Sequence, residues 1–195
     1  MLTVTKSSRP KASYGDCLGY AAKERKIPMT KELHYTLRPY KKEEADYIAE
    51  AHDRIYREEY GWGEGFSKYA KQVVYDFAAA PKRDHAEMWV ADVDGQPVGS
   101  IMLQETEETG VGQLRLFLLE KAYRRHGIGE ALMDLALEKA EEWGFHHLFL
   151  WTAEPLQDAR RKYAQLGFVI TDKELMTDWT LDGSEVYEER WDKEL

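Results

Sequence analysis

The stretch Arg124-Arg125-His126-Gly127-Ile128-Gly129 has the residue types and the spacing of an anion-binding site. It follows a hydrophobic segment over 113–119 and opens a segment of helical periodicity that runs to Trp143. The N–H groups in the first turn of a helix have no partner within the helix and lie at the positive end of its dipole. Glycine lets a phosphate approach that backbone closely, and two arginines add positive charge. The alternative is a strand-to-helix turn that needs glycine only for its geometry.

The spacing Arg-x-x-Gly-x-Gly after a hydrophobic strand resembles the pyrophosphate-binding motif of the GNAT superfamily of N-acetyltransferases. A nucleoside-triphosphate loop is excluded because G-x-x-x-x-G-K-[ST] does not occur, and a dinucleotide loop because the arginine precedes the glycines. The resemblance implies that residues 124–129 hold the pyrophosphate of acetyl-CoA. It also implies a splayed strand whose backbone at Phe117, Leu118 and Leu119 binds the pantetheine arm, with an N–H near Leu119 polarising the thioester carbonyl.

A second stretch, Ala159-Arg160-Arg161-Lys162-Tyr163-Ala164-Gln165-Leu166-Gly167-Phe168, resembles the other signature of the superfamily, a helix with A-x-x-x-Y that ends in G-F. Tyr163 falls on the same helical stripe as Leu156 and Leu166, so it is expected to face inward. The resemblance places its hydroxyl against the CoA sulfur, where it would protonate the departing thiolate as a general acid. The alternative is a tyrosine of the core. Many members carry asparagine where this chain has Leu156, which puts one cofactor contact in doubt.

The acceptor amine of this superfamily usually enters across the first two helices. His52, Tyr56, Tyr60 and Trp62 gather there, and we expect them to form the acceptor pocket. The alternative is that the aromatic rings cap the core and that His52 bonds a backbone group. Glu105 is the expected general base, because family bases commonly lie at the end of the corresponding strand. Transfer is expected to be direct.

A narrower resemblance, to the acetyltransferase half of MarR–GNAT fusion proteins, rests on three stretches: His52-x-x-x-Tyr56-x-x-x-Tyr60-Gly61-Trp62, Leu114-Arg115-Leu116 and Leu150-Trp151-Thr152. In those fusions a winged-helix DNA-binding domain precedes the catalytic domain. The stretch before His34 is too short for such a domain, so DNA binding is not carried over.

The elements that must position these residues follow from hydrophobic periodicity and turn signals. Strands are expected over 34–38, 87–93, 98–105, 113–119, 147–151, 168–171 with a continuation towards Trp179, and 185–191. Helices are expected over 42–60, 66–80, 127–143 and 155–166. This order is mixed α/β, and with the resemblance it predicts a GNAT fold: a seven-stranded, mostly antiparallel sheet, about four helices and a splayed central strand pair. Residues 1–31 are interpreted as an N-terminal arm and 32–195 as the catalytic domain.

Composition narrows the function classes. The chain has 195 residues and a formal net charge of −9, which argues against a basic nucleic-acid-binding face. A single cysteine excludes an internal disulfide and a Cys/His zinc set, so no metal is expected. No membrane segment or secretory signal is apparent, which favours the cytoplasm. The expected partners are an acyl-CoA and an amine, and a homodimer is left open. The alternatives are an acyl-CoA-binding sensor without turnover and an acyltransferase that uses a longer acyl-CoA.

Overall fold

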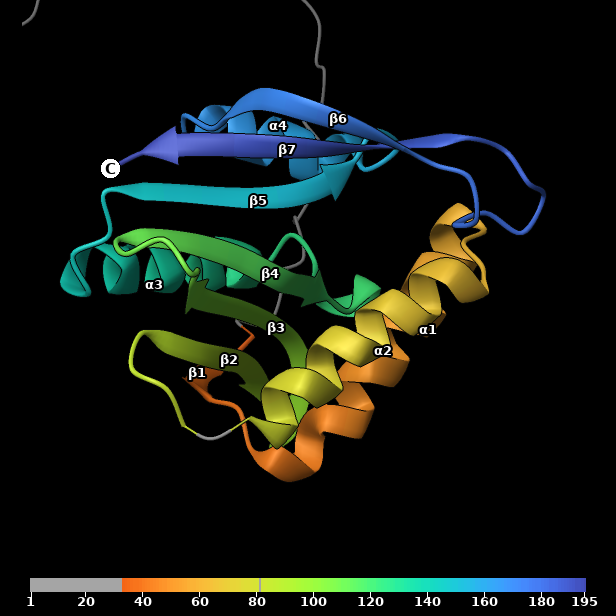
Figure 1. The fold of residues 1–195 in the computed structure, drawn as a ribbon. Coiled ribbons are helices and arrows are strands. Elements are labelled where there is room, and N and C mark those ends of the chain that lie inside the picture. Colours follow the sequence, from red (N-terminus) through yellow and green to blue (C-terminus); the bar gives the residue numbers. More distant parts are fainter. Residues whose placement is uncertain (1–32, 81) are drawn as a thin grey trace, which may run out of the picture. The chain divides into compact units, whose positions relative to one another are not determined.

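The computed structural model describes residues 33–80 and 82–195. They form one seven-stranded sheet in the order β1-β2-β3-β4-β5-β7-β6, and only the β4–β5 pair is parallel (Figure 1). The expected fold class, a mostly antiparallel α/β sheet of seven strands, is confirmed. The strands are β1 (Thr36–Pro39), β2 (Ala86–Val93), β3 (Gln96–Glu105), β4 (Val111–Leu119), β5 (His147–Ala153), β6 (Val169–Met176) and β7 (Val186–Glu194). The proposed N-terminal arm lies outside the described residues.

Four α-helices cover the two faces of the sheet: α1 (Ala45–Tyr60), α2 (Glu64–Ala79), α3 (Ile128–Glu142) and α4 (Gln157–Gln165), with short 3-10 turns η1 (Lys42–Glu44) and η2 (Lys121–Tyr123). The apolar stripe of α1, with Ile48 and Ala49, packs with Val74 of α2 against Met88 and Met102 of the sheet. The stripe of α3 packs on the opposite face (Figure 1). The helix expected from Pro155 begins at Gln157, because Glu154 and Pro155 first form a turn that the Leu156 N–H closes on the Ala153 carbonyl.

The β2–β3 hairpin turns on Asp94-Gly95, as this dipeptide predicts. Both residues have positive φ, 52° at Asp94 and 80° at Gly95, which matches the mirror-image turn that suits twisted strands. The Asp92 carboxylate also accepts the N–H of Gly95 at 2.8 Å. A tight turn here fixes the register of the antiparallel half of the sheet.

The strand pair β4–β5 is joined over four residues only. Residues Val111–Leu114 pair with His147–Leu150, and the remainder of β4 has no partner on its β5 edge. At this point Leu116 adopts φ 50°, and the register with β3 shifts between Ser100 and Met102. The Ser100 hydroxyl donates to the Leu116 carbonyl at 2.9 Å, which holds the bulge in place. The expected splayed central strand pair is therefore present, and it has a local backbone cause.

The connection between β6 and β7 docks onto the turn between α1 and α2. The N–H of Gly63 donates to the Trp179 carbonyl at 2.6 Å, and the N–H of Leu181 donates to the Gly61 carbonyl at 2.8 Å. An isolated antiparallel bridge joins Trp62 to Thr180. The far end of the sheet is thereby tied to the first two helices.

A buried carboxylate links α4 to the last two strands. Glu189 of β7 is fully buried and accepts hydrogen bonds from Arg160 at 2.8 and 3.1 Å and from the Trp191 indole at 3.2 Å. Lys173 of β6 lies 2.7 Å from the same carboxylate. Burial alone would raise the pKa of Glu189, but the hydrogen bonds from Lys173 and Arg160 lower it below its usual value. The carboxylate is therefore held as an anion between two cations.

Replacing Glu189 by glutamine should lower the free energy of unfolding at pH 7 by about 2–3 kcal/mol, because two cations lose their buried partner. A lowered folded-state pKa stabilises the fold above the usual value of 4.5, and this stabilisation is lost as the pH falls through the folded pKa. The difference between wild type and variant in urea unfolding should shrink as the pH falls below 4.5. Glu194→Gln, whose side chain is 80% exposed, is the matched control and should cost less than about 1 kcal/mol. Equal losses at the two positions would contradict this account.

Candidate functional site

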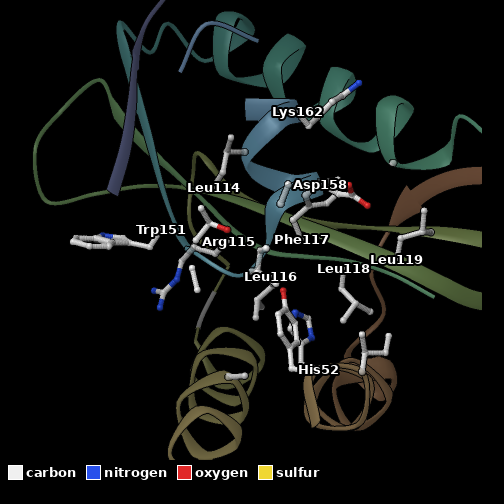
Figure 2. A pocket seen from close by; sticks show the side chains of 18 of the residues that line it. His52, Leu114, Arg115, Leu116, Phe117, Leu118, Leu119, Trp151, Asp158 and Lys162 are labelled. Carbon is white, nitrogen blue, oxygen red and sulfur yellow. The ribbon is translucent and has the colours of Figure 1, made fainter. Parts of the chain in front are cut away.

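A cavity of about 560 Å³ lies where β4 and β5 part. Figure 2 shows residues 114–119 of β4 crossing it, between His52 of α1 and Asp158 and Lys162 of α4. Its volume falls in the range of pockets that enclose small ligands. The residues that line it are His52, Ile55, Tyr56, Tyr60, Trp62, Phe66, Tyr69, Ala70, Val73, Gln113 to Leu119, Arg124, Arg125, Gly127, Gly129, Glu130, Trp151 to Ala153, Leu156, Asp158, Ala159, Lys162, Tyr163, Trp179 and Glu188.

One end of the cavity is the N-terminus of α3. Gly127 caps this helix with φ 79°, no side chain caps its free N–H groups, and no atom lies within 4 Å of the place a Gly127 Cβ would occupy. Arg125 is exposed beside it and also lines the cavity. Ile128 points into the core, where it is fully buried, so only its backbone faces this end, and His126 is not part of the lining. The arrangement can bind an anion through backbone N–H groups and Arg125.

Arg124 is engaged elsewhere, although the motif predicts that it contacts phosphate. Its guanidinium donates two hydrogen bonds to Glu59 of α1 at 2.7 and 2.8 Å and a third to the Leu119 carbonyl at 3.0 Å. The hydrogen bonds that it donates to Glu59 raise the pKa of Arg124 against the effect of burial. Bidentate pairing of this kind is geometrically specific. Arg124 therefore ties α1 to the anion-binding loop and also lines the cavity, and its contact with phosphate stays a prediction.

A carboxylate and an ammonium group stand next to the anion-binding end. Glu130 lies in the first turn of α3, and Lys162 of α4 donates to it at 2.7 Å. The hydrogen bond from Lys162 lowers the pKa of Glu130. This pairing offsets the negative charge that Glu130 would otherwise present to an approaching phosphate.

The exposed edge of β4 forms the floor of the cavity. The side chains of Phe117 and Leu119 pack towards α3, whereas Leu118 packs against Ala51 and Ile55 of α1. Because the β5 edge of the strand is unpaired beyond Leu114, its free backbone N–H and C=O groups are available to an extended ligand. The three residues expected at this place do lie there.

Tyr163 of α4 borders the cavity from the α3 side of the sheet. Its ring is 6% exposed and packs against Phe168 and Trp191. Burial raises the pKa of Tyr163 well above its usual value, with a smaller contribution from Tyr56 across the cavity. The hydroxyl therefore stays protonated at neutral pH and can act as a hydrogen-bond or proton donor, but not as a base.

His52 lies on the α1 side, and its Nδ1 is 2.8 Å from the Ile48 carbonyl. Burial lowers the pKa of His52 to about 4, against the raising effect of this hydrogen bond. The ring is therefore neutral at pH 7, donates from Nδ1 and presents an unprotonated Nε2. It can accept a hydrogen bond from a ligand, but it adds no positive charge to the cavity.

The remaining aromatic residues expected at the acceptor side form one packed cluster. Tyr56 stacks on Trp62 with centroids 4.9 Å apart, and Trp62 also contacts Phe66 at 4.6 Å and Trp179 at 5.1 Å. Trp62 is only 2% exposed. Tyr60 is half-buried at the rim, with its ring 5.8 Å from that of Tyr56. These residues line the cavity and also build the core, and their contact with an acceptor stays a prediction.

Glu105 is not brought to the cavity. Its carboxylate accepts the N–H of Gly110 at 2.8 Å and lies 3.1 Å from Nδ1 of His85. The hydrogen bonds from Gly110 and His85 lower its pKa. Glu105 pairs in register with Gly112, at the end of β4 opposite to the splayed residues. The structure therefore places the expected general base in a turn, away from the residues it was expected to serve.

Arg115, Trp151, Trp179 and Glu188 are among the residues of the cavity lining that the sequence analysis did not single out by their chemistry. Arg115 and Trp151 occur in short stretches of family resemblance, which is a weak signal. Trp179 and Glu188 reach the cavity because β7 inserts between β5 and β6. Among the described residues, no group of His, Cys, Asp or Glu is suited to hold a metal ion. In the same part of the chain, no helix is long and apolar enough to cross a membrane.

Comparison with known sequences points to one family. Residues 46–168 match the sequence profile described as the acetyltransferase (GNAT) family. An uncharacterized N-acetyltransferase of Methanocaldococcus jannaschii is 29% identical over 150 residues, which are 74% of this chain and 64% of that protein. N-acetyltransferase 8F1 of Rattus norvegicus is 28% identical over 127 residues, or 63% of this chain and 58% of the rat protein. The chain thus spans about three fifths of the length of these two relatives.

Solved structures share the fold at low sequence identity. YncA of Salmonella typhimurium, solved with acetyl-CoA and described as an acetyltransferase, has a TM-score of 0.63 and 14% identity, over 83% of this chain and 94% of that one. The ribosomal-protein-alanine N-acetyltransferase of Brucella melitensis has a TM-score of 0.64 and 17% identity, over 82% and 99% of the two chains. At this level of identity the likeness shows the fold alone.

The two histidines with opposite environments should titrate in opposite directions. We expect a midpoint near pH 4 for His52, because burial disfavours its charged form. For His147 we expect a midpoint above 6.5, because hydrogen bonds with Asp192 and Glu194 outweigh its burial. NMR titration of the imidazole resonances measures both, and His52→Gln and His147→Gln assign them. A His52 midpoint at or above 6 would mean that its ring is solvated and able to carry charge in the cavity.

Proposed function

The chain belongs to the acetyltransferase (GNAT) family, and on this premise we propose that it transfers the acetyl group of acetyl-CoA directly to a primary amine. The observation that carries the proposal is the cavity between the parted strands β4 and β5, which joins a helix N-terminus, an unpaired strand edge and a buried tyrosine. These are the three features that a phosphate-bearing thioester requires. The proposal extends to the acceptor class, a primary amine of a small molecule or a protein.

The residues present fit the pyrophosphate, the pantetheine arm and the thioester of acetyl-CoA. The free N–H groups at the start of α3, the open space at Gly127 and the Arg125 guanidinium suit the pyrophosphate. The unpaired edge of β4 at Phe117, Leu118 and Leu119 suits the amide groups of the pantetheine arm, which can pair with it as an added strand. A backbone N–H near Leu119 would then polarise the thioester carbonyl.

Tyr163 is proposed as the proton donor to sulfur. A free thiol has a pKa of ~8.5, so CoA leaves as a thiolate. A proton donor within reach of the sulfur prevents the return of the acetyl group to it. The raised pKa of Tyr163 keeps this group protonated until the C–S bond breaks. His52, Tyr56, Tyr60 and Trp62 are proposed to shape the acceptor side, with His52 accepting a hydrogen bond through Nε2.

Three further proposals concern the setting of the reaction. A cytoplasmic location is supported by the single cysteine and the net charge of −9. A homodimer is supported by the exposed apolar side chains Val169, Ile170 and Leu175 on edge strand β6. A closer relation to the acetyltransferase half of MarR–GNAT fusion proteins is supported by the three stretches of resemblance described above.

Calorimetry should detect binding of acetyl-CoA to the wild type and no binding to Gly127→Glu. A carboxylate at this position occupies the open space at the start of α3 and repels the pyrophosphate. Gly127→Asn is the matched control, because asparagine tolerates the positive φ of 79° and adds no charge. It should keep most of the affinity. Unchanged affinity in a folded Gly127→Glu variant would remove the pyrophosphate site from this helix.

The wild type should release CoA and acetylate at least one member of an amine panel, read by thiol release and mass spectrometry. Tyr163→Phe keeps the ring and its packing, so it should bind acetyl-CoA almost as well as the wild type. Because it lacks a proton donor, its kcat should fall about 10²–10⁴-fold with little change in KM. A kcat within about twofold of wild type, with chemistry limiting the rate, would make Tyr163 a packing residue.

A further inference from the structure

Glu188 of β7 lines the cavity from the side opposite to Tyr163. It lies two residues from Val186, which packs with Trp62 and Trp179, so both face α1 and α2. The other face of β7 carries Glu189 and Trp191, towards α4. Glu188 pairs in register with Ala153 of β5. Ala153 lies beyond Leu150, the last residue of β5 that pairs with β4. A carboxylate thus borders the gap on the side of the acceptor residues.

Within the described residues, the Glu188 carboxylate has no hydrogen bond or ion pair, whereas the two charged residues that follow it on β7, Glu189 and Arg190, are paired. Glu189 is bound by Arg160 and Lys173, and Arg190 is bound to Asp192 with its guanidinium over the Phe149 ring. A half-buried carboxylate without a partner is unfavourable unless a ligand supplies the partner.

Two charged groups face Glu188 from neighbouring elements. Glu174 lies opposite it on β6, on the exposed edge of the sheet. Arg115 of β4 lines the same cavity and donates to the Tyr69 hydroxyl of α2 at 3.2 Å, with no carboxylate within 4 Å among the described residues. The Glu188 carboxylate and the Arg115 guanidinium thus line the same cavity and attract each other without pairing.

We propose that Glu188 binds the ammonium group of the acceptor and is the general base that removes its proton, directly or through one water molecule. This inference rests on the proposed acetyl transfer and names the acceptor as a cationic primary amine. It places the base on β7, in place of Glu105 of β3.

The proton and electron balance closes with the residues present. The ammonium gives one proton to the Glu188 carboxylate, and the freed lone pair forms the N–C bond with the thioester carbon. The C–S bond breaks with its electron pair on sulfur, which takes the proton of Tyr163. The second proton of the amine nitrogen returns to Tyr163, and Glu188 releases its proton to solvent. One amide, one CoA thiol and one proton result.

The environment of Glu188 suits this task. Burial, and to a smaller extent the Glu174 carboxylate, raise the pKa of Glu188 to about 7, while Arg115 lowers it. A base is most effective when its pKa lies near the working pH. Glu105, whose pKa is lowered, would be a much weaker base.

The test is the pH profile of kcat/KM for CoA release with tyramine and spermidine as probe amines, between pH 6 and 10. In the wild type, kcat/KM should rise to a plateau above about pH 7. Glu188→Gln should be about 10²–10⁴-fold slower at pH 7.5. Its kcat/KM should keep rising about tenfold per pH unit towards the pKa of the amine, near ~10, because only the neutral amine then reacts. A merely structural role would lower the rate evenly at all pH values.

Substitutions at two residues near Glu188 should move the rising part of the kcat/KM pH profile in opposite directions. Arg115→Gln should shift it to higher pH and Glu174→Gln to lower pH, as their effects on the Glu188 carboxylate require. Glu185→Gln, an exposed carboxylate of the preceding loop outside the cavity, is the control and should leave the profile unchanged.

The outcomes separate the two levels of the proposal. If the wild type turns over a probe amine and Glu188→Gln stays within about threefold of it at pH 7.5, the assignment of Glu188 is overturned and acetyl transfer stands. If Glu188→Gln is slow but its kcat/KM still rises to a plateau at the same pH as in the wild type, Glu188 is not the base. Binding of acetyl-CoA without CoA release to any probe amine would overturn both proposals.

Discussion

The parting of β4 from β5 is the constraint on which the remaining architecture depends. A parallel pair would normally continue to the ends of both strands, but a left-handed residue at Leu116 ends it after Leu114. Backbone N–H and C=O groups in a sheet are rarely left without partners, so the free edge beyond Leu114 is a binding surface that the fold keeps open. The cavity and the unpaired edge of β4 that forms its floor both lie at this local change in backbone direction.

The walls of the cavity are fixed by ion pairs rather than by packing alone. Arg124 and Glu59 tie α1 to the loop before α3, Lys162 and Glu130 tie α4 to the first turn of α3, and Arg160 with Glu189 ties α4 to β7. Each pair joins elements that are far apart in sequence, across a gap that no sheet hydrogen bonds bridge. Groups positioned by such contacts need little reordering when a ligand binds. More of the binding energy is then available to orient the ligand.

The features predicted well from the sequence are local ones. The anion-binding loop and Tyr163 each lie within about ten residues of a strand end or a helix end. Over so short a stretch, the spacing of residues determines the direction in which their side chains point. The ion pair of Arg124 was not predicted, because its partner, Glu59, lies on another helix. Glu105 was expected at the acceptor site by analogy with the family. It pairs with Gly112 at the start of β4, whereas the bulge at Leu116 and the unpaired residues lie towards the other end of that strand. Glu188 could not be predicted as a cavity residue, because the side to which it points depends on the insertion of β7 between β5 and β6. Hydrophobic periodicity does not reveal such a non-local strand pairing.

The proposed acid and base stand on opposite faces of one sheet, and this explains why the sheet must be open between them. Tyr163 belongs to the core on the α3 and α4 side, whereas Glu188 faces α1 and α2. In a continuous sheet these groups would be separated by a layer of hydrogen-bonded backbone and could not reach one carbonyl carbon. A thioester held in the gap would be within reach of Tyr163 from one face and of an amine beside Glu188 from the other. The same gap keeps a proton donor and a proton acceptor apart, so neither neutralises the other before the amine arrives.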